Sequence, residues 1–552
     1  MQVGQMNISS REAVVEKLAS AEFDVLVIGG GVTGVGAALD AATRGLRVAL
    51  IEANDFACGT SSRSSKLIHG GLRYLEQYDF KLVREALKER ELMVGHTAPH
   101  LVSPVSFLFP LHEGVKERGY VGAGLALYDA LRGRERILPA HRHISSRKMR
   151  EVAPALRSDI LKGGILYYDA QVDDARHTVT IARTAERYGA LVANQVEAIA
   201  LIREGGRVVG VKVCDRESGR EFEIKSATTV LAAGIWNSKI QEAAAVNHGY
   251  DIAMSKGVHI VLPKSAIALK TGVILKTALS VLFVIPWKEF WIVGTTDTPW
   301  TGSKEEPLAN LEDIDYIIEQ ANQVLRHPLK HSDVISVYAG IRPLVAPTEV
   351  SSTTKISREH VVDHPIEGLI SVAGGKYTTY RIMARDAIDA AASDLLRIVP
   401  ESCTEEIALL GADGYSALLN RVNALAVANS LTREVVLHLL SRYGSLFEEV
   451  LEPAKLDATL LEKIDPHLPY LLAEIRYAIT HEKALHISDV LMRRTRIAIE
   501  VSDRGVAAAR IVAQVMAPLL GWDSAKSDRE IAEYDDLVAR EFASETVIGG
   551  AA

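Results

Sequence analysis

Residues 60–76, TSSRSSKLIHGGLRYLE, concentrate side chains that can form hydrogen bonds. The segment holds five serine or threonine residues, three cations, one histidine and the pair Gly70 and Gly71. It has too few apolar residues for a core strand, and a glycine pair lets the backbone pass close to a flat ligand. On composition alone, a ligand-binding loop and an ordinary polar loop are equally open.

A nucleotide-binding pattern precedes this segment. DVLVIG (24–29) is an apolar run of strand length that enters GGGVTG, where Gly29, Gly31 and Gly34 fit G-x-G-x-x-G. A small-residue helix (35–44) and a second strand ending at Glu52 follow, which is the context that makes the motif specific. The three glycines allow a tight turn, close approach of a diphosphate and close helix packing, and the helix N-terminus attracts the diphosphate. Glu52 can accept a hydrogen bond from an adenosine ribose and would repel a 2′-phosphate, which disfavours NADP.

Two later segments favour FAD over NAD. TTVLAAGIWN (228–237) and GLISVAGGKYTTYRIMARDAIDA (368–390) each predict a strand that runs into a small-residue or glycine turn, and the second continues into a helix. No second G-x-G-x-x-G occurs in the chain. Strand-to-glycine junctions so far apart predict one nucleotide-binding fold interrupted by insertions. The second helix start would direct its amides at negative charge developing on a flavin ring.

Composition limits the classes of protein. The 552 residues are 48% hydrophobic and 24% charged, with a net charge of −8, which predicts several globular domains and gives no support for nucleic-acid binding. The three cysteines form no CxxC pair, so we expect a reducing cytosol, no disulfide and no metal site. The first twenty residues lack a signal-peptide core, and no run approaches 18 apolar residues, so we expect no membrane-spanning helix.

The expected fold class is α/β, with a discontinuous nucleotide-binding domain. We assign this domain to residues 21–100, 170–255 and 335–400, and a substrate domain on an antiparallel sheet to residues 100–170 and 255–335. Beyond Gly414 only five of the 40 glycines remain, and apolar residues recur at helical spacing, for example in 428–444 and 470–482. Residues 401–552 are therefore predicted to form an all-α domain. We expect loose tails at residues 1–20 and 543–552.

Several motifs together resemble the FAD-dependent, respiratory glycerol-3-phosphate dehydrogenases. The matching segments are residues 60–76, VDDARH (172–177), VIPW (284–287), GTTDT (294–298), GIRPL (340–344), AGGKYTTYR (373–381), EIRYAITHEKA (474–484) and DVLMRRTR (489–496). The resemblance covers nearly all of the chain beyond the first twenty residues. One departure is SREH (357–360), where Glu359 stands in place of an expected aspartate. The resemblance implies a Rossmann-like FAD domain of the glutathione-reductase or D-amino-acid-oxidase type.

The implied reaction is oxidation of sn-glycerol 3-phosphate to dihydroxyacetone phosphate, with hydride transfer from C2 to FAD N5. The expected cofactor-binding residues are Gly29, Gly31, Gly34, Glu52, Thr60, Ser61, Ser62, Ser65, His69, Gly70, Val196, Gly234, Trp236, Gly375, Lys376, Tyr377 and Thr378. The expected substrate-binding residues are Arg73, Tyr74, His259, Thr296, Arg342, Arg358 and Lys376, because a dianionic phosphate requires guanidinium and ammonium groups.

The expected catalytic residues are His69, Arg342 and Lys376. His69 is our hypothesis for the base that removes the C2 hydroxyl proton, because histidine titrates in the right range. His259 is the rival, and a histidine that only orients the flavin ring is equally open. Arg342 can also stabilise developing alkoxide charge.

Three smaller patterns have structural interpretations. Asp173, Asp174 and Arg176 are predicted to hold a strand-to-helix corner by capping and pairing. The RRTR cluster (493–496) is predicted to make ion pairs with the main body. Cys58 is interpreted as a small buried residue.

The resemblance implies a membrane quinone as electron acceptor. Residues 113–150 carry nine Lys or Arg against four acids beside an apolar segment, which predicts peripheral binding to the inner face of the cell membrane from the cytoplasm. A solvated basic face is the alternative for that segment, and a homodimer is left open. For the whole protein, the alternatives are an oxidase that reduces O2 to H2O2, a non-catalytic flavin or metabolite sensor, and an amine oxidase.

Overall fold

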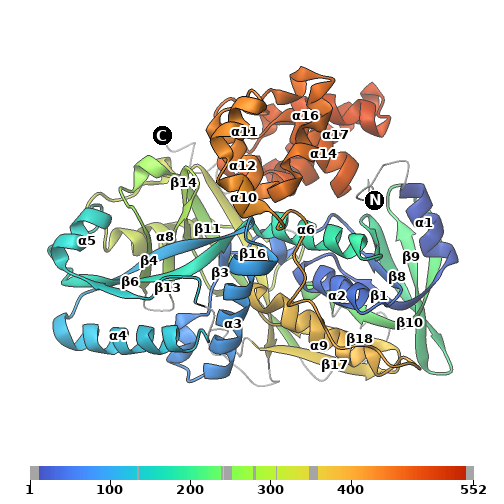
Figure 1. The fold of residues 1–552 in the computed structure, drawn as a ribbon, viewed down its shortest axis with the longest axis horizontal. Helices are drawn as coiled ribbons and strands as arrows, with labels where there is room; N and C mark the ends of the chain where they lie inside the picture. The colour runs from blue at the N-terminus through green and yellow to red at the C-terminus, as the bar shows by residue number, and fades with distance from the viewer. Residues whose placement is uncertain are drawn as a thin grey trace.

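The structure is a computed structural model, and it describes residues 11–133, 136–237, 240, 251–277, 281–305, 307–346 and 359–541. It has three parts: two sheets, each with its own helices, lie side by side, and a helical part lies over both (Figure 1).

The first sheet is built around the central strand β1 (Glu22–Ile28), which is parallel to its neighbours. The strand order is β17-β18-β10-β1-β2-β7, and β8 and β9 extend it from β10. The other strands are β2 (Val48–Ile51), β7 (Leu191–Ala193), β8 (Val196–Glu204), β9 (Arg207–Asp215), β10 (Glu221–Leu231), β17 (His360–Ile366) and β18 (Leu369–Gly374).

Both faces of this sheet are covered, which explains why β1 is almost continuously apolar. Val25 and Val27 face a core shared with helices α2 (Val32–Thr43), α6 (Asp174–Arg187) and α9 (Tyr380–Ala392). Leu26 and Ile28 alternate to the other face and pack against β8, β9 and helix α1 (Arg11–Ser20). The predicted α/β fold is confirmed.

Helix α1 corrects one expectation. Residues 11–20 were predicted to belong to a loose tail, but Val15 and Leu18 are buried against the sheet, and Arg11 donates to Asn194 O at 2.9 Å. The apolar residues of this short helix were too few to indicate from the sequence that it packs against the sheet. Residues 1–10 and 543–552 lie outside the described residues.

The second sheet has the order β15-β11-β14-β13-β12-β4-β6-β3, with β16 added on β11 and β5 on β6. Its strands are β3 (Leu67–Ile68), β4 (Val102–Leu111), β5 (Arg142–Ile144), β6 (Gly163–Val172), β11 (Asp251–Pro263), β12 (Gly272–Lys276), β13 (Val281–Trp287), β14 (Phe290–Gly294), β15 (Thr298–Pro299) and β16 (Ser336–Ala346). Its helices are α3 (Phe80–Leu92), α4 (Gly114–Ala130), α5 (Ser146–Val152) and α8 (Leu311–Asn322).

The described pairs in this sheet are antiparallel except β12 with β4, so the antiparallel prediction is confirmed with one exception. The strand assignment also shifts a predicted boundary. Residues 336–346 were assigned to the nucleotide-binding domain, but β16 pairs with β11 along eleven residues of the second sheet. The same correction applies to β3 (67–68), which pairs with β6, and to residues 170–172 and 251–255, which belong to β6 and β11. Helix α3 is tied to β6 by the Arg90–Asp169 ion pair. The remaining domain division stays a proposal.

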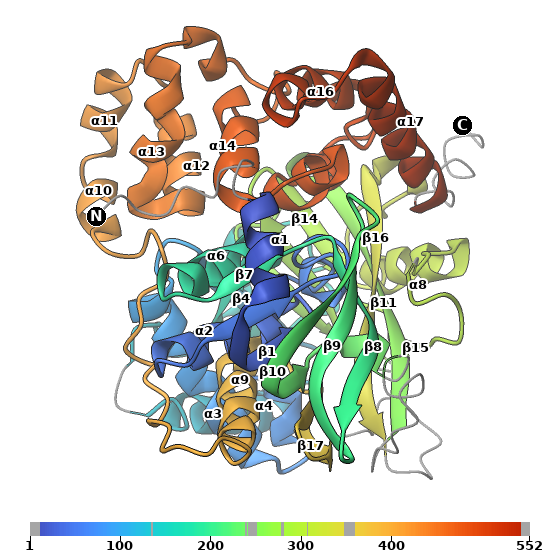
Figure 2. The same ribbon diagram turned by 90° about the vertical axis from the view of Figure 1, so that its right-hand side faces the viewer.

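The C-terminal part is all-α, as predicted: residues 401–414 form turns and loops, and the regular elements of residues 415–541 are helices and helical turns. Its helices are α10 (Tyr415–Leu419), α11 (Val422–Ala428), α12 (Arg433–Tyr443), α13 (Phe447–Leu451), α14 (Leu472–Glu482), α15 (Ile497–Glu500), α16 (Val506–Leu520) and α17 (Ser524–Glu541). A π-helical turn, η13 (Asp489–Arg494), faces the nucleotide-binding part and contacts α6. Figure 2 shows this helical layer above both sheets.

Candidate functional site

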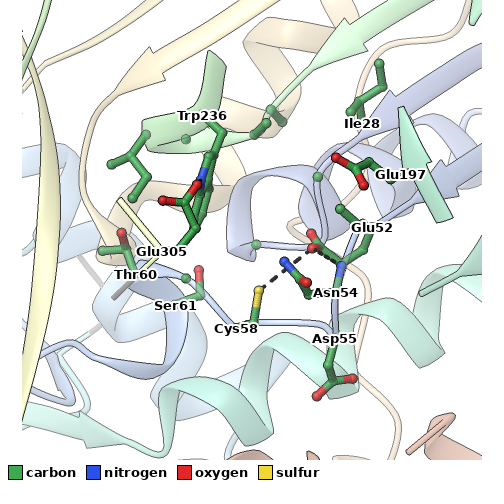
Figure 3. A pocket seen from close by; sticks show the side chains of 18 of the residues that line it. Ile28, Glu52, Asn54, Asp55, Cys58, Thr60, Ser61, Glu197, Trp236 and Glu305 are labelled. Carbon is green, nitrogen blue, oxygen red and sulfur yellow. Dashed lines mark hydrogen bonds between the residues drawn. The ribbon is translucent and has the colours of Figure 1, made fainter. Parts of the chain in front are cut away.

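A cavity of about 1240 Å³ lies at the carboxyl ends of the parallel strands of the first sheet. Glu52 and Ala232 follow β2 and β10 directly and line it, together with Ile28 at the end of β1 (Figure 3). Open α/β sheets bind ligands at this edge, where the strand order reverses. The fold therefore places a ligand cavity where the glycine motif predicts one.

The glycine motif forms the tight turn that a diphosphate requires. Gly29 has a φ of +115°, and a Cβ atom added at Gly34 would lie 1.9 Å from the Gly29 carbonyl oxygen. Gly31 is the N-cap of α2 and lines the cavity, so bare backbone and the helix N-terminus face the space. Ser61 Oγ accepts a hydrogen bond from Val32 N at 2.9 Å, which ties the hydroxyl-rich loop to this helix start.

Glu52 is held rigidly beside the motif. Its two carboxylate oxygens accept hydrogen bonds from Gly30 N at 2.6 Å and Asn54 N at 2.8 Å. Burial raises the pKa of Glu52 against the effect of these bonds. Cys58 Sγ lies 3.8 Å from the same carboxylate, and burial also raises the pKa of this thiol. These residues fit the adenosine and diphosphate parts of FAD.

Most of the predicted cofactor-binding residues line the cavity. They are Gly29, Gly31, Glu52, Thr60, Ser61, Val196, Gly234, Trp236, Gly375, Lys376 and Tyr377. Trp236 Nε1 donates to Glu305 at 3.2 Å, and Figure 3 shows this pair on the side of the cavity near Thr60. The others are not among the residues that line the cavity: Gly34, Ser62, Ser65, His69, Gly70 and Thr378.

One group of predicted residues gathers around the glycine pair of the opening segment. Lys376 Nζ lies 3.5 Å from the centroid of the Tyr74 ring, and the Gly71 backbone (φ +75°) passes beside the same ring. His69 N donates to Thr378 Oγ1 at 3.2 Å. The segment after β3 therefore packs directly against the turn after β18.

A second group lies on the long β11–β16 pair. In this pair, His259 of β11 lies opposite Tyr338 of β16, and Ser255 of β11 lies opposite Arg342 of β16. Side chains alternate between the two faces along a strand, and positions 255 and 259 are four residues apart, so His259 and Arg342 lie on the same face of the sheet. Arg342 donates to Thr295 Oγ1 at 2.8 Å and to the Thr296 carbonyl at 3.2 Å.

His259 joins this group to the opening segment. Its Nε2 lies 2.8 Å from Ser65 Oγ, and its ring stacks on Tyr338 with centroids 4.8 Å apart. Burial, with the nearby Arg342 and Lys66, holds the pKa of His259 well below its usual range, so the ring is neutral at physiological pH.

Three predicted substrate-binding residues are not placed at the site by side-chain contacts. The Thr296 hydroxyl is buried and accepts a hydrogen bond from Val258 N at 3.0 Å, so it serves the sheet backbone. Arg73 lies in the turn η3 (Leu72–Leu75), but its side chain lies outside what the structure describes. Arg358 also lies outside the described residues.

Sequence reasoning missed part of the cavity wall. Asn54 and Gln195 line it from the loops just after β2 and β7, and Glu197 lines it from the start of β8; the nearness of these positions to strand ends could have indicated them. Residues of the C-terminal part also line it, including His486, Met492, Arg493 and Glu541. No local motif links them to a nucleotide, so only the tertiary structure reveals them.

The structural interpretations of the Asp173 corner and of the RRTR cluster are confirmed, whereas Cys58, which was expected to be buried, is half-buried and lines the cavity. Asp173 caps α6 by accepting from Arg176 N at 3.3 Å, and the RRTR cluster makes buried ion pairs with Asp55, Asp173 and Asp174. Within the described ranges, no cluster of three or more His, Cys, Asp or Glu side chains is suited to a metal ion. Among the helices that the structure describes, none has both the length and the apolar character to cross a bilayer.

Comparison with known proteins agrees with this site. The FAD dependent oxidoreductase family matches residues 24–381, and the C-terminal domain of alpha-glycerophosphate oxidase matches residues 402–527. Glycerol-3-phosphate dehydrogenase of Mycobacterium leprae is 51% identical over 535 residues, which cover 97% of this chain and 91% of the relative. The human mitochondrial glycerol-3-phosphate dehydrogenase is 37% identical over 95% of this chain and 74% of its own length.

A solved structure extends the likeness to the cofactor. The glycerol-3-phosphate dehydrogenase of Bacillus halodurans, complexed with FAD, superposes with a TM-score of 0.80 at 30% identity and covers 97% of this chain and 98% of its own. The chain therefore belongs to the glycerol-3-phosphate dehydrogenase family of FAD-dependent oxidoreductases, and FAD is its cofactor.

Proposed function

We propose that this protein oxidises sn-glycerol 3-phosphate to dihydroxyacetone phosphate and passes the electrons to a membrane quinone. The observation that carries the proposal is the match to glycerol-3-phosphate dehydrogenases over nearly the whole chain at 51% identity. FAD, held by the residues that line the cavity, would supply a two-electron acceptor there. Oxidation of the substrate would transfer its C2 hydrogen with two electrons to that acceptor and its hydroxyl proton to a base, so that the C2–O bond becomes a carbonyl.

The cations of the site would bind the dianionic phosphate and the reacting oxygens. Lys376, which lines the cavity beside Tyr74, would hold a substrate oxygen next to the flavin. Arg342 and Arg358 would clamp the phosphate, because a guanidinium group binds phosphate oxygens bidentately. Arg342 would also stabilise negative charge on the C2 oxygen as its proton leaves.

Two histidines, His259 and His69, are the candidates for the proton acceptor. His259 is neutral and lies near Arg342, whereas His69 lies in the loop that contacts Lys376 through Gly71. His69→Gln and His259→Gln, compared in rapid-mixing measurements of flavin reduction, distinguish the two. We expect the base variant to lose at least a hundredfold in rate at pH 7, in line with typical general-base contributions. A rate near the wild type for His69→Gln would remove His69 as the base.

The substrate is tested by anaerobic bleaching of the flavin. We expect glycerol 3-phosphate to bleach it, and glycerol or amino acids to leave it yellow, because only a dianion engages the cations. No bleaching by glycerol 3-phosphate would contradict the dehydrogenase and favour a sensor. Comparing H2O2 yield with quinone reduction then separates the oxidase from the quinone-linked enzyme.

Peripheral membrane contact is supported by the basic segment 113–150. Helix α4 leaves Val115 and Tyr120 87% and 68% exposed, while Leu125 and Tyr128 face the core. An apolar edge among basic residues suits anionic headgroups. We expect flotation with anionic vesicles at low salt and none with neutral ones. Absence of binding to anionic vesicles would leave α4 as a solvated basic face.

A further inference from the structure

The loop between Glu52 and Lys66 forms much of the wall of the cofactor cavity. Side chains of the C-terminal domain hold this loop in place. Cys58, Gly59, Thr60 and Ser61 of this loop line the cavity. The loop contains little secondary structure apart from the turn η2 (Thr60–Ser62). Its conformation therefore depends on side-chain anchors.

The first anchor is a buried ion pair at Asp55. Arg494 binds the Asp55 carboxylate bidentately, with both distances 2.7 Å, and Arg493 Nε adds a third contact at 2.5 Å. Asp55 and Arg494 side chains are each only 1% exposed. The two guanidinium groups outweigh burial and lower the pKa of Asp55 to about 2. Asp55 lies three residues beyond Glu52, so the anchor restrains the adenosine end of the loop.

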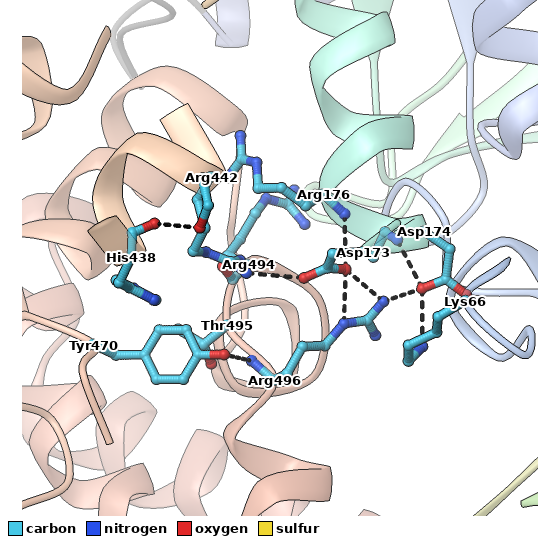
Figure 4. Close-up of polar contacts among 12 residues, drawn as sticks. Lys66, Asp173, Asp174, Arg176, His438, Arg442, Tyr470, Arg494, Thr495 and Arg496 are labelled. Carbon is cyan, nitrogen blue, oxygen red and sulfur yellow. Dashed lines mark hydrogen bonds and ion pairs between the residues drawn. The ribbon is translucent and has the colours of Figure 1, made fainter. Parts of the chain in front are cut away.

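The second anchor lies at the other end of the loop. Arg496 Nη1 donates to Ser62 O at 3.3 Å, and Arg496 also pairs with Asp174. Asp174 in turn accepts from Ser64 N at 3.0 Å and Lys66 Nζ at 2.9 Å (Figure 4). One short turn of the C-terminal domain, residues 489–496, thus holds the loop on both sides of its cavity-lining residues 58–61.

The turn itself is rigid. Thr495 Oγ1 donates to Val490 O at 2.8 Å, and Arg496 N donates to the buried Tyr470 hydroxyl at 3.2 Å. Met492 and Arg493 of the turn line the cavity directly. Buried polar networks whose groups are paired restrain the side chains and backbone that they join.

We propose that the C-terminal helical domain is a working part of the FAD site, in which Arg493, Arg494 and Arg496 are positioning residues that hold the loop 52–66 against the cofactor. They act through Asp55 and Asp174. Loss of either anchor frees Thr60 and Ser61, and the holoenzyme then releases FAD faster.

The test compares Arg494→Lys and Arg496→Lys with Lys288→Met. The lysine variants keep the charge but lose the guanidinium fork. Lys288 is the matched control, because it joins the second sheet to the same C-terminal domain through Tyr470 (2.8 Å) and Glu500 (3.2 Å) and does not line the cavity. Its replacement leaves the Tyr470 hydroxyl able to accept from Arg496 N, so both anchors of the loop stay in place. FAD release from each holoenzyme after dilution is followed by the rise of free-flavin fluorescence.

We expect at least tenfold faster release from both lysine variants and less than a twofold change from Lys288→Met at similar loss of thermal stability. Release within twofold of the wild type, or an equal rise in the control, would overturn the proposal. The measurement uses no substrate, so its result is independent of the proposed reaction.

Hydrogen exchange on the wild-type protein tests the proposal without any variant. Coupling between two sites is reciprocal. If the turn formed by residues 489–496 strengthens FAD binding, FAD binding must in return stabilise the folded conformation of that turn. We expect amides of residues 489–496 to exchange at least fivefold more slowly with FAD bound than in the flavin-free protein. Equal exchange in the two forms would contradict the coupling.

Discussion

Replacing Gly34 by alanine tests whether close packing of α2 on β1 sets the cofactor affinity. The added Cβ atom would lie 1.9 Å from the Gly29 carbonyl oxygen, whereas Cβ contacts under 3.0 Å are essentially never found. The start of α2 must therefore move by more than 1 Å from a backbone atom that cannot turn aside. The displaced helix N-terminus carries the amides that face the diphosphate. Overpacking of this kind costs about 1–3 kcal/mol.

If the whole of that free energy appears in cofactor binding, FAD affinity falls by about 5- to 150-fold, because 1.4 kcal/mol corresponds to tenfold. Titration of flavin-free protein with FAD, followed by flavin fluorescence, measures this change. Gly124→Ala is the control, since its Cβ meets no atom within 4 Å and it lies in helix α4. FAD affinity for Gly34→Ala within threefold of the wild type would refute the reasoning.

Three further changes test other parts of the structure. Arg342→Lys should raise KM for glycerol 3-phosphate about 10- to 100-fold. Charged hydrogen bonds contribute about 1.5–3 kcal/mol each, and lysine lacks the forked guanidinium group that can form two of them. Steady-state kinetics measure KM, and an unchanged value would exclude phosphate binding by Arg342. Lys256→Met leaves the buried Asp313 carboxylate, 2.5 Å from the ammonium group in the wild type, without its partner. It should destabilise the protein by about 3–5 kcal/mol, seen as a melting temperature several degrees lower. His486 lies between two carboxylates, whose hydrogen bonds outweigh burial and raise its pKa to about 11 from 6.5; the stabilisation it provides is full below about pH 6.5 and is lost as the pH rises toward 11. The loss of melting temperature in His486→Gln should therefore be larger at pH 6.5 than at pH 9.5, and a pH-independent loss would contradict the charged pair.

The local patterns predicted the elements that carry their own signal. The apolar run before Gly29, the glycine spacing and Glu52 at the end of the second strand specify a βαβ unit, and the structure has β1, α2 and β2 there. The drop in glycine content beyond Gly414 likewise predicted the helical C-terminal part. Predictions were weaker where pairing partners are distant, as for β16, whose place in the second sheet depends on β11 some 80 residues earlier.

Predictions about single side chains were weaker for the same reason, because their hydrogen-bond partners lie in distant segments of the chain. Thr296 follows a strand in a motif, but its hydroxyl is used by Val258 N, a contact that no spacing reveals. Helix α1 was missed because its burial depends on the face of the sheet that it covers.

The sequence by itself indicated the nucleotide-binding unit, the cofactor class and the set of cations suited to a phosphate ester, because each is carried by short motifs that can be recognised one at a time, even where the motifs lie far apart in the chain. Only the tertiary structure decided that the arginines at 493, 494 and 496 hold a loop more than 400 residues earlier, at Asp55 and Ser62. The physical reason is the exclusion of water. The attraction within an ion pair becomes strong, and its loss costly, only when surrounding segments exclude water from it. That exclusion requires distant segments to come together in the folded chain.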